Sequence, residues 1–339
     1  MSRTLLVSIM LLLLMLTVSC AKRNTAYQDG GKLSLAYTIP VVGDPYHLNY
    51  VGGKLYVAMD QGGLGIIDPQ THHLKSFTSL RAADGSVVNL LRIRKVGVVP
   101  ERNLMFLNEI QGTDLIRIID TANPDSLDPF DSITGASQDI QDMICRNLVD
   151  DPDDNLVEII YCNGIFINYG RFNGNIWIGS DFSIEAPASI TGLDMDEQYI
   201  YAAAQQRGLF VYERSDHPQL ISETSFPGEA QKIVVHDGIA YFASRQSGIQ
   251  ILDVSNPQNP SHLSSFDTTG YASDLAYHDG KLAVSSGSGG VYFFDVTDPA
   301  NPKLVQRITE CGYANTVAFV DNQLVIASRD EGILFYDID

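Results

Sequence analysis

The chain is poor in the residues and motifs on which many enzymes and nucleic-acid-binding proteins depend. Its 339 residues include 4 cysteines, none in a Cys-x-x-Cys pair, and 22 basic residues against 41 acidic ones. The formal net charge of −19 repels phosphate backbones, so we do not expect nucleic acid as a partner. The motifs Gly-x-Ser-x-Gly and His-Glu-x-x-His and the phosphate-binding loop are missing from the sequence. We therefore expect no metal, no cofactor and no catalytic residues.

Long apolar runs are also scarce. One uncharged, largely apolar run from Leu5 to Val18 follows Arg3, and its 14 residues fall short of the ~20 that span a bilayer as a helix. It predicts an export signal. The end of the run, Thr17-Val18-Ser19-Cys20, resembles the lipobox of bacterial lipoproteins, although Thr17 stands where that family prefers leucine. The alternative is an ordinary cleaved signal in which Cys20 has no role.

The lipobox resemblance implies three segments and a location. Residues 1–19 would be the signal peptide, and residues 20–31 would be the lipidated Cys20 with a polar tether. Residues 32–339 would be the folded domain. Because Ala21 rather than aspartate follows the cysteine, the enteric sorting rule favours the outer membrane. We expect a lipid-anchored protein of the bacterial cell envelope that contacts the membrane through its lipid alone.

Two of the other cysteines flank the acidic turn at residues 150–155. Cys145 and Cys162 are placed symmetrically about residues 153 and 154. In a hairpin that turns there, the two side chains would lie opposite each other, within reach of a disulfide. The sequence therefore predicts a Cys145–Cys162 bridge in an exported protein, and two buried free thiols are the alternative.

The main feature that is present is a unit that returns every 42 residues. It is marked by three sets of equally spaced residues: Gly228, Gly270 and Gly312; Gly248, Gly290 and Gly332; Asp253, Asp295 and Asp337. Short β-type runs separated by Gly, Asn, Asp and Pro at this period are typical of propeller blades. In one unit, residues 271–280, 281–289, 290–302 and 303–310 read as strands a to d with their turns.

Counting the runs that match strand c gives seven blades. The chain stops at Asp339, directly after the seventh strand c, so the last blade lacks its strand d. Residues 31–40 form an unassigned strand before the first strand a. We predict an all-β, seven-bladed β-propeller closed by this N-terminal strand, because closure removes an open sheet edge.

The repeated segments also resemble a known family. The runs GIQILDVSNPQNP (248–260) and GVYFFDVTDPANP (290–302) are similar to the LVIVD-repeat family of bacterial and archaeal propellers. The likeness is strong over residues 228–339, fair over 41–80 and 188–227, and poor over 81–187. It implies a fold and a surface location but no common catalytic site, so no functional residue is carried over.

Most of the acidic and histidine side chains have structural positions in this repeat. An aspartate follows strand c in five blades (Asp68, Asp120, Asp253, Asp295 and Asp337), and a residue that recurs in each blade is expected to accept hydrogen bonds from the following turn. Of the 7 histidines, only His47 falls on the top face, which is built by the loops between strands d and a and between strands b and c.

The top face is the candidate binding surface. Its loops contain a group of aromatic, basic and polar residues typical of binding sites for proteins or glycans: Tyr46, Tyr271, Tyr313, Arg245, Arg329, Asp274 and Asn315. The alternative is that each Gly-Tyr pair packs one blade against the next.

These observations favour a non-catalytic binding module for a protein or glycan ligand in the cell envelope. The rival function is a propeller-type, metal-dependent lactonase or hydrolase with its site in the central channel, where Asp139, Asp274 and Asn315 would begin an acidic cluster. A passive envelope scaffold is a third interpretation.

Overall fold

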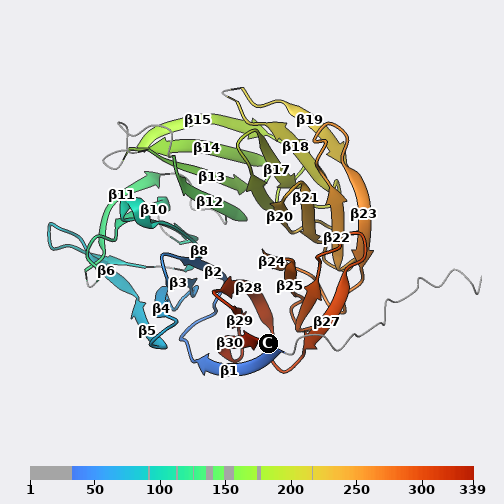
Figure 1. The fold of residues 1–339 in the computed structure, drawn as a ribbon. Coiled ribbons are helices and arrows are strands. Elements are labelled where there is room, and N and C mark those ends of the chain that lie inside the picture. Colours follow the sequence, from blue (N-terminus) through green and yellow to red (C-terminus); the bar gives the residue numbers. More distant parts are fainter. Residues whose placement is uncertain are drawn as a thin grey trace, which may run out of the picture.

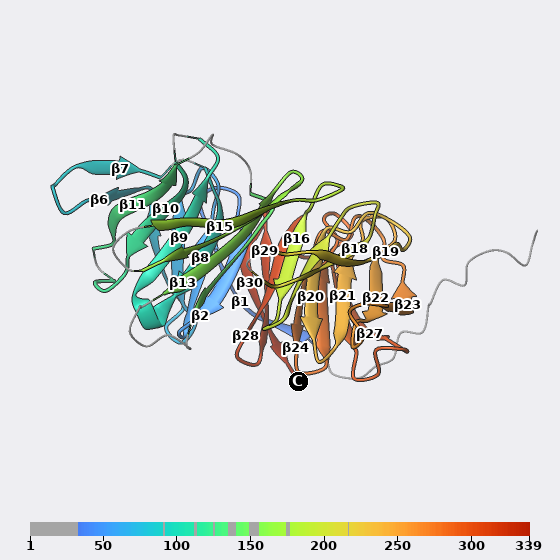
Figure 2. The ribbon, with the colours of Figure 1, turned by 90° about the horizontal axis from the view of Figure 1, so that it is seen from above.

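The computed structural model describes residues 33–90, 92–111, 114–124, 126–134, 140–148, 156–173, 177–215 and 217–339. In these residues, seven four-stranded antiparallel sheets follow one another around a central axis (Figure 1). The same ring is seen from its edge in Figure 2. The predicted all-β, seven-bladed propeller is confirmed.

Each blade is an antiparallel meander with its first strand nearest the axis (Figure 1). Blade 1 contains β2 (His47–Val51), β3 (Lys54–Ala58), β4 (Leu64–Asp68) and β5 (His73–Phe77); blade 2 contains β8 (Ile93–Val99), β9 (Leu104–Glu109), β10 (Asp114–Asp120) and β11 (Asp128–Thr134). Blade 3 contains β12 (Asp142–Asn147), β13 (Val157–Asn163), β14 (Phe166–Phe172) and β15 (Trp177–Glu185); blade 4 contains β16 (Gly192–Met195), β17 (Tyr199–Ala203), β18 (Leu209–Glu213) and β19 (Leu220–Thr224). Blade 5 contains β20 (Lys232–His236), β21 (Ile239–Ala243), β22 (Ile249–Asp253) and β23 (Ser261–Phe266); blade 6 contains β24 (Asp274–His278), β25 (Lys281–Ser285), β26 (Val291–Asp295) and β27 (Lys303–Ile308).

The N-terminal strand closes the ring as predicted. Blade 7 consists of β28 (Ala314–Val320), β29 (Gln323–Ser328), β30 (Gly332–Ile338) and, outermost, β1 (Leu33–Ile39). Strand β1 pairs along the whole of β30, and the Tyr37 ring stacks between His72 of blade 1 and Phe335 of β30, with ring centroids 3.7 and 4.3 Å away. Gln306 of blade 6 holds the start of β1 by hydrogen bonds of 2.8 and 3.2 Å to the Leu33 backbone.

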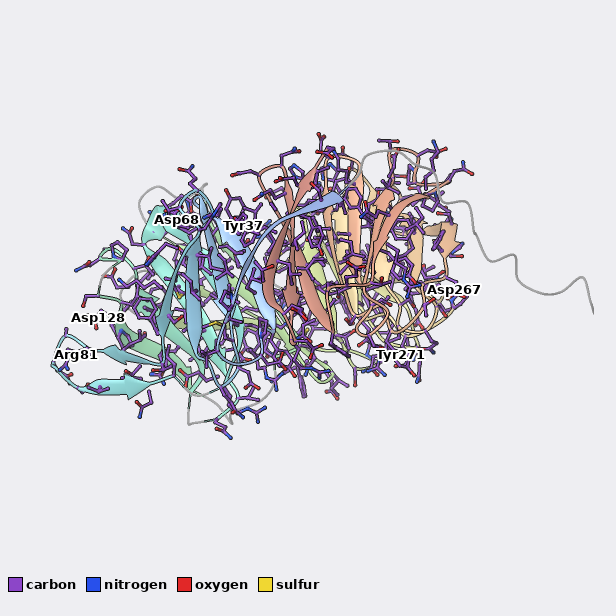
Figure 3. The ribbon with its side chains drawn as sticks, turned by 90° about the horizontal axis from the view of Figure 1, so that it is seen from below. Tyr37, Asp68, Arg81, Asp128, Asp267 and Tyr271 are labelled. Carbon is purple, nitrogen blue, oxygen red and sulfur yellow. The ribbon has the colours of Figure 1, made fainter. Side chains whose placement is uncertain are left out.

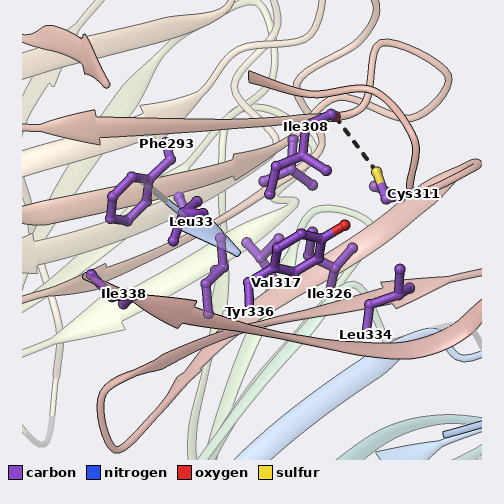
Figure 4. Packing of buried hydrophobic residues seen from close by; sticks show 13 residues of the cluster. Leu33, Phe293, Ile308, Cys311, Val317, Ile326, Leu334, Tyr336 and Ile338 are labelled. Atoms are coloured by element: carbon purple, nitrogen blue, oxygen red, sulfur yellow. Dashed lines mark hydrogen bonds between the residues drawn. The ribbon is translucent and has the colours of Figure 1, made fainter. Parts of the chain in front are cut away.

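The hydrophobic core lies between neighbouring blades. One cluster joins Phe293 of blade 6 to Val317 and Leu334 of blade 7 and to Leu33 of β1 (Figure 4). Because a blade is covered on both faces, its central strands are apolar without alternation, and β22 and β26 are buried except at their final aspartates. This explains the continuous apolar runs of strand c.

The turns follow the chemistry of their residues. Asp237-Gly238 and Asp279-Gly280 connect strands a and b with positive φ at every position, between +47° and +76°, as a tight hairpin requires. The aspartates after strand c accept backbone N–H bonds: Asp253 from Ser255 at 2.9 Å and Asp295 from Thr297 at 3.0 Å. Asp68 and Asp120 bind the turn in the same way, which confirms the structural role for four of the five aspartates. Asp337 instead accepts the side-chain amide of Gln323 at 2.7 Å.

The early blades contain an element that the repeat did not predict. A hairpin of β6 (Ser79–Arg81) and β7 (Val87–Asn89) is inserted between blades 1 and 2 and projects from the ring (Figures 1 and 2). The Ala83 N–H donates to Asp128 at the start of β11, 3.0 Å away, so the hairpin lies against the outer side of blade 2. A 3₁₀ turn, η1 (Pro100–Arg102), replaces the tight turn between β8 and β9.

The predicted Cys145–Cys162 disulfide is wrong, and the strand register explains why. Cys145 lies opposite Ile159, whereas Cys162 lies opposite Asp142, three positions further along the hairpin. An offset of three residues places the two side chains on opposite faces of blade 3. Both cysteines are free: Cys145 packs toward blade 2 and Cys162 toward blade 4.

The predicted signal peptide (1–19), Cys20 and the whole tether to residue 31 lie outside the described residues, as does the acidic turn at residues 150–155. None of the helical segments that the structure describes is long and apolar enough to cross a membrane.

Candidate functional site

A ring of side chains occupies the top end of the central channel. Each blade contributes one residue of its innermost strand, namely the residue that pairs with a position near the end of the second strand. These seven residues are His47, Lys95, Asp142, Gly192, Lys232, Asp274 and Thr316. The innermost strand enters from the top face, so the ring lies just below the channel mouth.

One ion pair spans two blades of this ring. Lys232 Nζ of blade 5 lies 2.6 Å from Asp142 Oδ2 of blade 3, and blade 4 stands between them. Blade 4 contributes Gly192 at the ring position, and a Cβ there would lie 2.9 Å from the Lys232 Cα and 2.9 Å from the Gln231 carbonyl oxygen. The missing side chain therefore lets blades 4 and 5 approach each other and leaves Lys232 free to reach Asp142.

The ion pair holds both groups in their charged forms. Burial opposes ionisation of Asp142, but the charges of Lys232 and Lys95 outweigh it and lower the pKa of the carboxyl. Burial likewise opposes the charge on Lys232, and the neighbouring carboxylates, Asp142 first, outweigh it and raise the pKa of the ammonium.

The acids of the channel also hold adjacent blades together. Asp142 accepts the Leu193 N–H of blade 4 at 2.9 Å, and Asp194 accepts the Val235 N–H of blade 5 at 2.6 Å. Asp274 accepts the Thr316 hydroxyl and, at 3.4 Å, the Val317 N–H of blade 7. Each carboxylate thus satisfies backbone donors on the open inner edge of the next sheet.

The same burial shifts their protonation. It raises the pKa of Asp194 to about 6, and it raises the pKa of Asp274 against the lowering effect of Lys232. Burial, followed by the charge of Lys95, brings the pKa of His47 well below its ordinary value. Neutral His47 accepts the Val96 N–H through Nδ1 at 3.4 Å, which is a long hydrogen bond between blades 1 and 2.

Above the ring, a cavity of about 220 Å³ opens at the channel mouth. It is lined mostly by residues that directly precede the ring positions: Tyr46, Arg94, Lys95, Ile140, Gln141, Thr191, Gln231 and Ser273. The Arg94 guanidinium stacks on the Tyr46 ring at 3.5 Å. Tyr46 is the one predicted site residue that lines this cavity.

Four other predicted residues lie on the surrounding top loops. Tyr271 lies on this face with 65% of its surface exposed, whereas Asp68 lies on the opposite face of the propeller (Figure 3). Arg245 stands next to it, because its backbone pairs with Ala272, and its guanidinium contacts Glu229 at 3.0 Å. Arg329 stacks over the Tyr313 ring at 4.2 Å.

The loops differ in how far they support the packing alternative. Tyr313 packs against Gly287, where a Cβ would meet its ring at 3.0 Å, so this tyrosine does join two blades. Asn315 does the same between blades 7 and 1, donating to Asp44 at 2.6 Å and to the Pro45 carbonyl at 2.9 Å. Tyr271, 65% exposed, joins no two blades among the residues that the structure describes.

The proposed acidic cluster of the hydrolase hypothesis is not assembled as expected. Asp274 lies in the channel and Asn315 in the blade junction, while Asp139 is outside the described residues. Among the described residues, no group of three or more His, Cys, Asp or Glu side chains is placed to hold a metal ion.

Sequence reasoning missed Lys95, Asp142, Gly192 and Lys232. For Lys232 a signal existed, because the 42-residue period relates it directly to Asp274 and Thr316. For blades 2 to 4, the irregular loops hid the equivalent positions.

The comparisons with known proteins support the fold. The LVIVD repeat matches residues 227–268, which contain the whole of blade 5. No curated protein sequence matches the chain. Among solved structures, the computationally designed Ika8 protein is similar, with 14% identity and a TM-score of 0.58 over 89% of this chain and 98% of the designed one. This chain therefore contains an LVIVD repeat within a seven-bladed β-propeller.

Proposed function

We propose that this protein is a non-catalytic binding module that captures a protein or glycan ligand through its top face. The observation that carries the proposal is the pair of Tyr271 and Arg245 beside the channel mouth. Tyr271 exposes 65% of its surface although the next residue, Ala272, is held by backbone pairing with Arg245. Large exposed aromatic side chains next to arginine are typical anchors of binding surfaces.

The chemistry of the channel supports binding over turnover. Its carboxyl groups are engaged in joining blades: Asp142 with Lys232 and Leu193, Asp194 with Val235. A general acid or base needs a side chain that exchanges its proton with substrate. Groups that satisfy the inner sheet edges are committed to the fold instead.

Charge reversal on the top face tests this function. Arg245 and Arg329 are each about half exposed, so Arg245→Glu with Arg329→Glu should change stability by less than about 1 kcal/mol. It should abolish capture of the ligand from cell-envelope extract. The matched control, Lys281→Glu with Lys303→Glu, makes the same change of charge on the opposite face and should leave capture intact. Equal capture by all three proteins would refute the proposed face.

The envelope location is a separate part of the proposal and rests on the apolar run that ends at Cys20. Cys20→Ser should move the protein from the membrane fraction to the soluble fraction and abolish labelling by a fatty-acid probe. Retention of the variant in the membrane would refute lipid anchoring and leave the binding face untested by that result.

A further inference from the structure

The channel-mouth cavity is lined by two cationic side chains that the fold pairs incompletely. Both belong to the start of β8. Arg94 stacks on the Tyr46 side chain, and both of these residues line the cavity. Lys95 also lines the cavity and is the blade 2 member of the channel ring. The gathering of two basic side chains at one cavity is unexpected in a chain of net charge −19. It indicates a specific use for these two residues.

Arg94 shares its carboxylate with a stronger partner. Arg92 binds Asp60 through Nε at 2.8 Å, whereas Arg94 Nη2 stays 3.6 Å from the same carboxylate, beyond hydrogen-bond distance. Arg94 Nε is buried and has no acceptor in the described part of the chain. One carboxylate therefore faces two guanidinium groups, and only one of them is well paired.

Lys95 is left without a carboxylate of its own. The neighbouring Asp142 uses both of its oxygens to bind Lys232, at 2.6 and 2.8 Å. No hydrogen bond or ion pair to the Lys95 ammonium is formed by the residues that the structure describes. The charge of Lys95 is nevertheless felt in the channel, where it lowers the pKa of Asp142 and of His47.

Two further carboxylates belong to the channel: Asp274 interacts electrostatically with Lys95 and Lys232, and Asp194 with Lys232. Asp194 accepts the N–H groups of Val235 and Met195, and Asp274 accepts the Thr316 hydroxyl. Neither carboxylate accepts a hydrogen bond from Arg94 or Lys95. They offset part of the positive charge but leave hydrogen-bond donors of Arg94 and Lys95 for a ligand.

We propose that the channel-mouth cavity binds a carboxylate group through Arg94 and Lys95. The proposal rests on the top face being the binding face, and it specifies the chemistry of the ligand at the centre of that face. The stack on Tyr46 holds the guanidinium plane in place, which suits the planar fork of a carboxylate.

Size and charge limit the ligand further. The cavity of about 220 Å³ is smaller than the roughly 300–1,000 Å³ of sites for drug-sized molecules, so it accommodates one small acid or one acidic group of a larger partner. Asp142, Asp194 and Asp274 repel a dianion more strongly than a monoanion. This favours a carboxylate over a phosphate. The carboxylate belongs either to a sugar acid or to an acidic side chain of a protein.

Calorimetric titration of the full chain distinguishes these sources. One arm uses D-glucuronate with methyl glucoside as its neutral counterpart. The second uses a short blocked peptide containing glutamate with the glutamine peptide as its counterpart, and the third uses inorganic phosphate. We expect binding of at least one carboxylate probe and none of its neutral counterpart, and the tighter probe identifies the source.

Substitutions at Lys95 place the binding at this cavity. Lys95→Gln should weaken the carboxylate probe about 10-fold, because it removes a charge-assisted hydrogen bond. Lys95→Arg should restore most of the affinity, and Lys303→Gln on the opposite face should have no effect. Thermal unfolding of each variant shows whether the fold is kept, and the Lys95→Arg rescue remains informative if Lys95→Gln is unstable.

Three results would overturn the inference: no binding of either carboxylate probe, equal binding of the neutral counterparts, or tighter binding of phosphate. Capture of a macromolecular ligand by the top face together with any of these would leave the proposed function standing and remove only the carboxylate site. If the protein binds a carboxylate probe but its top face captures no macromolecular ligand, the carboxylate site would stand and the proposed function would fall.

Discussion

Lys232 and Asp142 are joined through both carboxylate oxygens although they belong to blades 5 and 3. The pair crosses blade 4 at the position where that blade has Gly192. An ion pair that skips one blade links three successive sheets, because Asp142 also accepts the Leu193 N–H of blade 4. Asp142 belongs to blade 3, whose sequence resembles the 42-residue repeat poorly.

The first prediction concerns this pair. Lys232→Met should lower the free energy of unfolding by about 3 kcal/mol, because it leaves the buried Asp142 carboxylate without its cation. In Lys232→Met with Asp142→Leu, the loss should be smaller than the sum of the two single losses. Denaturant unfolding measures both effects. The exposed pair Arg207–Glu223 is the control, since Arg207→Met should cost no more than about 1 kcal/mol. Equal losses at the two pairs would contradict the assigned role.

Gly192 gives the second prediction. Its φ lies outside the left-handed region, so an alanine has no backbone strain there and would ordinarily be neutral or stabilising. The added Cβ would instead lie 2.9 Å from the Gln231 carbonyl oxygen and from the Lys232 Cα. Gly192→Ala should therefore destabilise the protein by about 1–3 kcal/mol in denaturant unfolding. A stabilised variant would show that blades 4 and 5 are not in close contact.

Much of the fold could be predicted because the repeat reports on backbone chemistry. The Asp-Gly turns, the aspartate after strand c and the apolar run before it each recur at a fixed spacing, and each has one local cause. The absence of a last strand d and the presence of an extra first strand then specified closure by β1.

The channel could not be predicted in the same way. Asp142 and Lys232 are 90 residues apart, and their meeting depends on the register of blade 3 and on a missing side chain in blade 4. The same register rules out the predicted disulfide, since β12 and β13 pair Cys145 with Ile159 and Cys162 with Asp142. When an irregular loop shifts the register of a hairpin, every side-chain partner changes with it.

The third prediction is a pH dependence of stability that arises from Asp194. Its pKa of about 6 in the folded state lies above the ordinary value, so the folded protein binds this proton more tightly than the unfolded chain. The resulting stabilisation is complete below about pH 4 and is lost as the pH rises through 6. Asp194→Asn stays neutral throughout, so between pH 4 and pH 7 its stability should rise relative to the wild type by up to about 3 kcal/mol.

Asp253 supplies the matching control with the opposite sign. Hydrogen bonds from the hydroxyl and N–H of Ser255 lower the pKa of this carboxyl, so its contribution is present above about pH 4 and lost below it. Asp253→Asn should therefore lose stability relative to the wild type as the pH rises from 3 to 5. If the Asp194 and Asp253 variants respond to pH alike, the burial of Asp194 has been misjudged.

The fourth prediction concerns the thiols. Burial raises the pKa of Cys145 and of Cys162, and the two side chains face opposite sides of blade 3. In the native protein we expect neither reaction with iodoacetamide nor a bridge, and complete alkylation of both residues after unfolding. Mass spectrometry of peptides from the non-reduced protein checks this. A linked pair of peptides would require a register that differs by three residues.

The last prediction concerns closure of the ring by β1. Deletion of residues 33–39 removes the whole pairing with β30, the Tyr37 stack between His72 and Phe335, and the Leu33 contact with Gln306. It leaves the edge of β30 open and uncovers the apolar cluster between blades 6 and 7. We expect aggregation or a large loss of thermal stability, because an exposed edge strand pairs readily with other chains.

A single substitution in β1 separates the effect of the open β30 edge from the effect of lost side-chain packing. Tyr37→Ala keeps every backbone hydrogen bond of β1. It removes the aromatic stack and the hydrogen bond from the Tyr37 hydroxyl to the Pro69 carbonyl (3.4 Å), so it should lower the free energy of unfolding by about 3–4 kcal/mol without aggregation. Size-exclusion chromatography with light scattering distinguishes the two variants. A monomeric deletion variant with the wild-type unfolding temperature would mean that β30 does not need β1, and the closure of this propeller would then lie elsewhere.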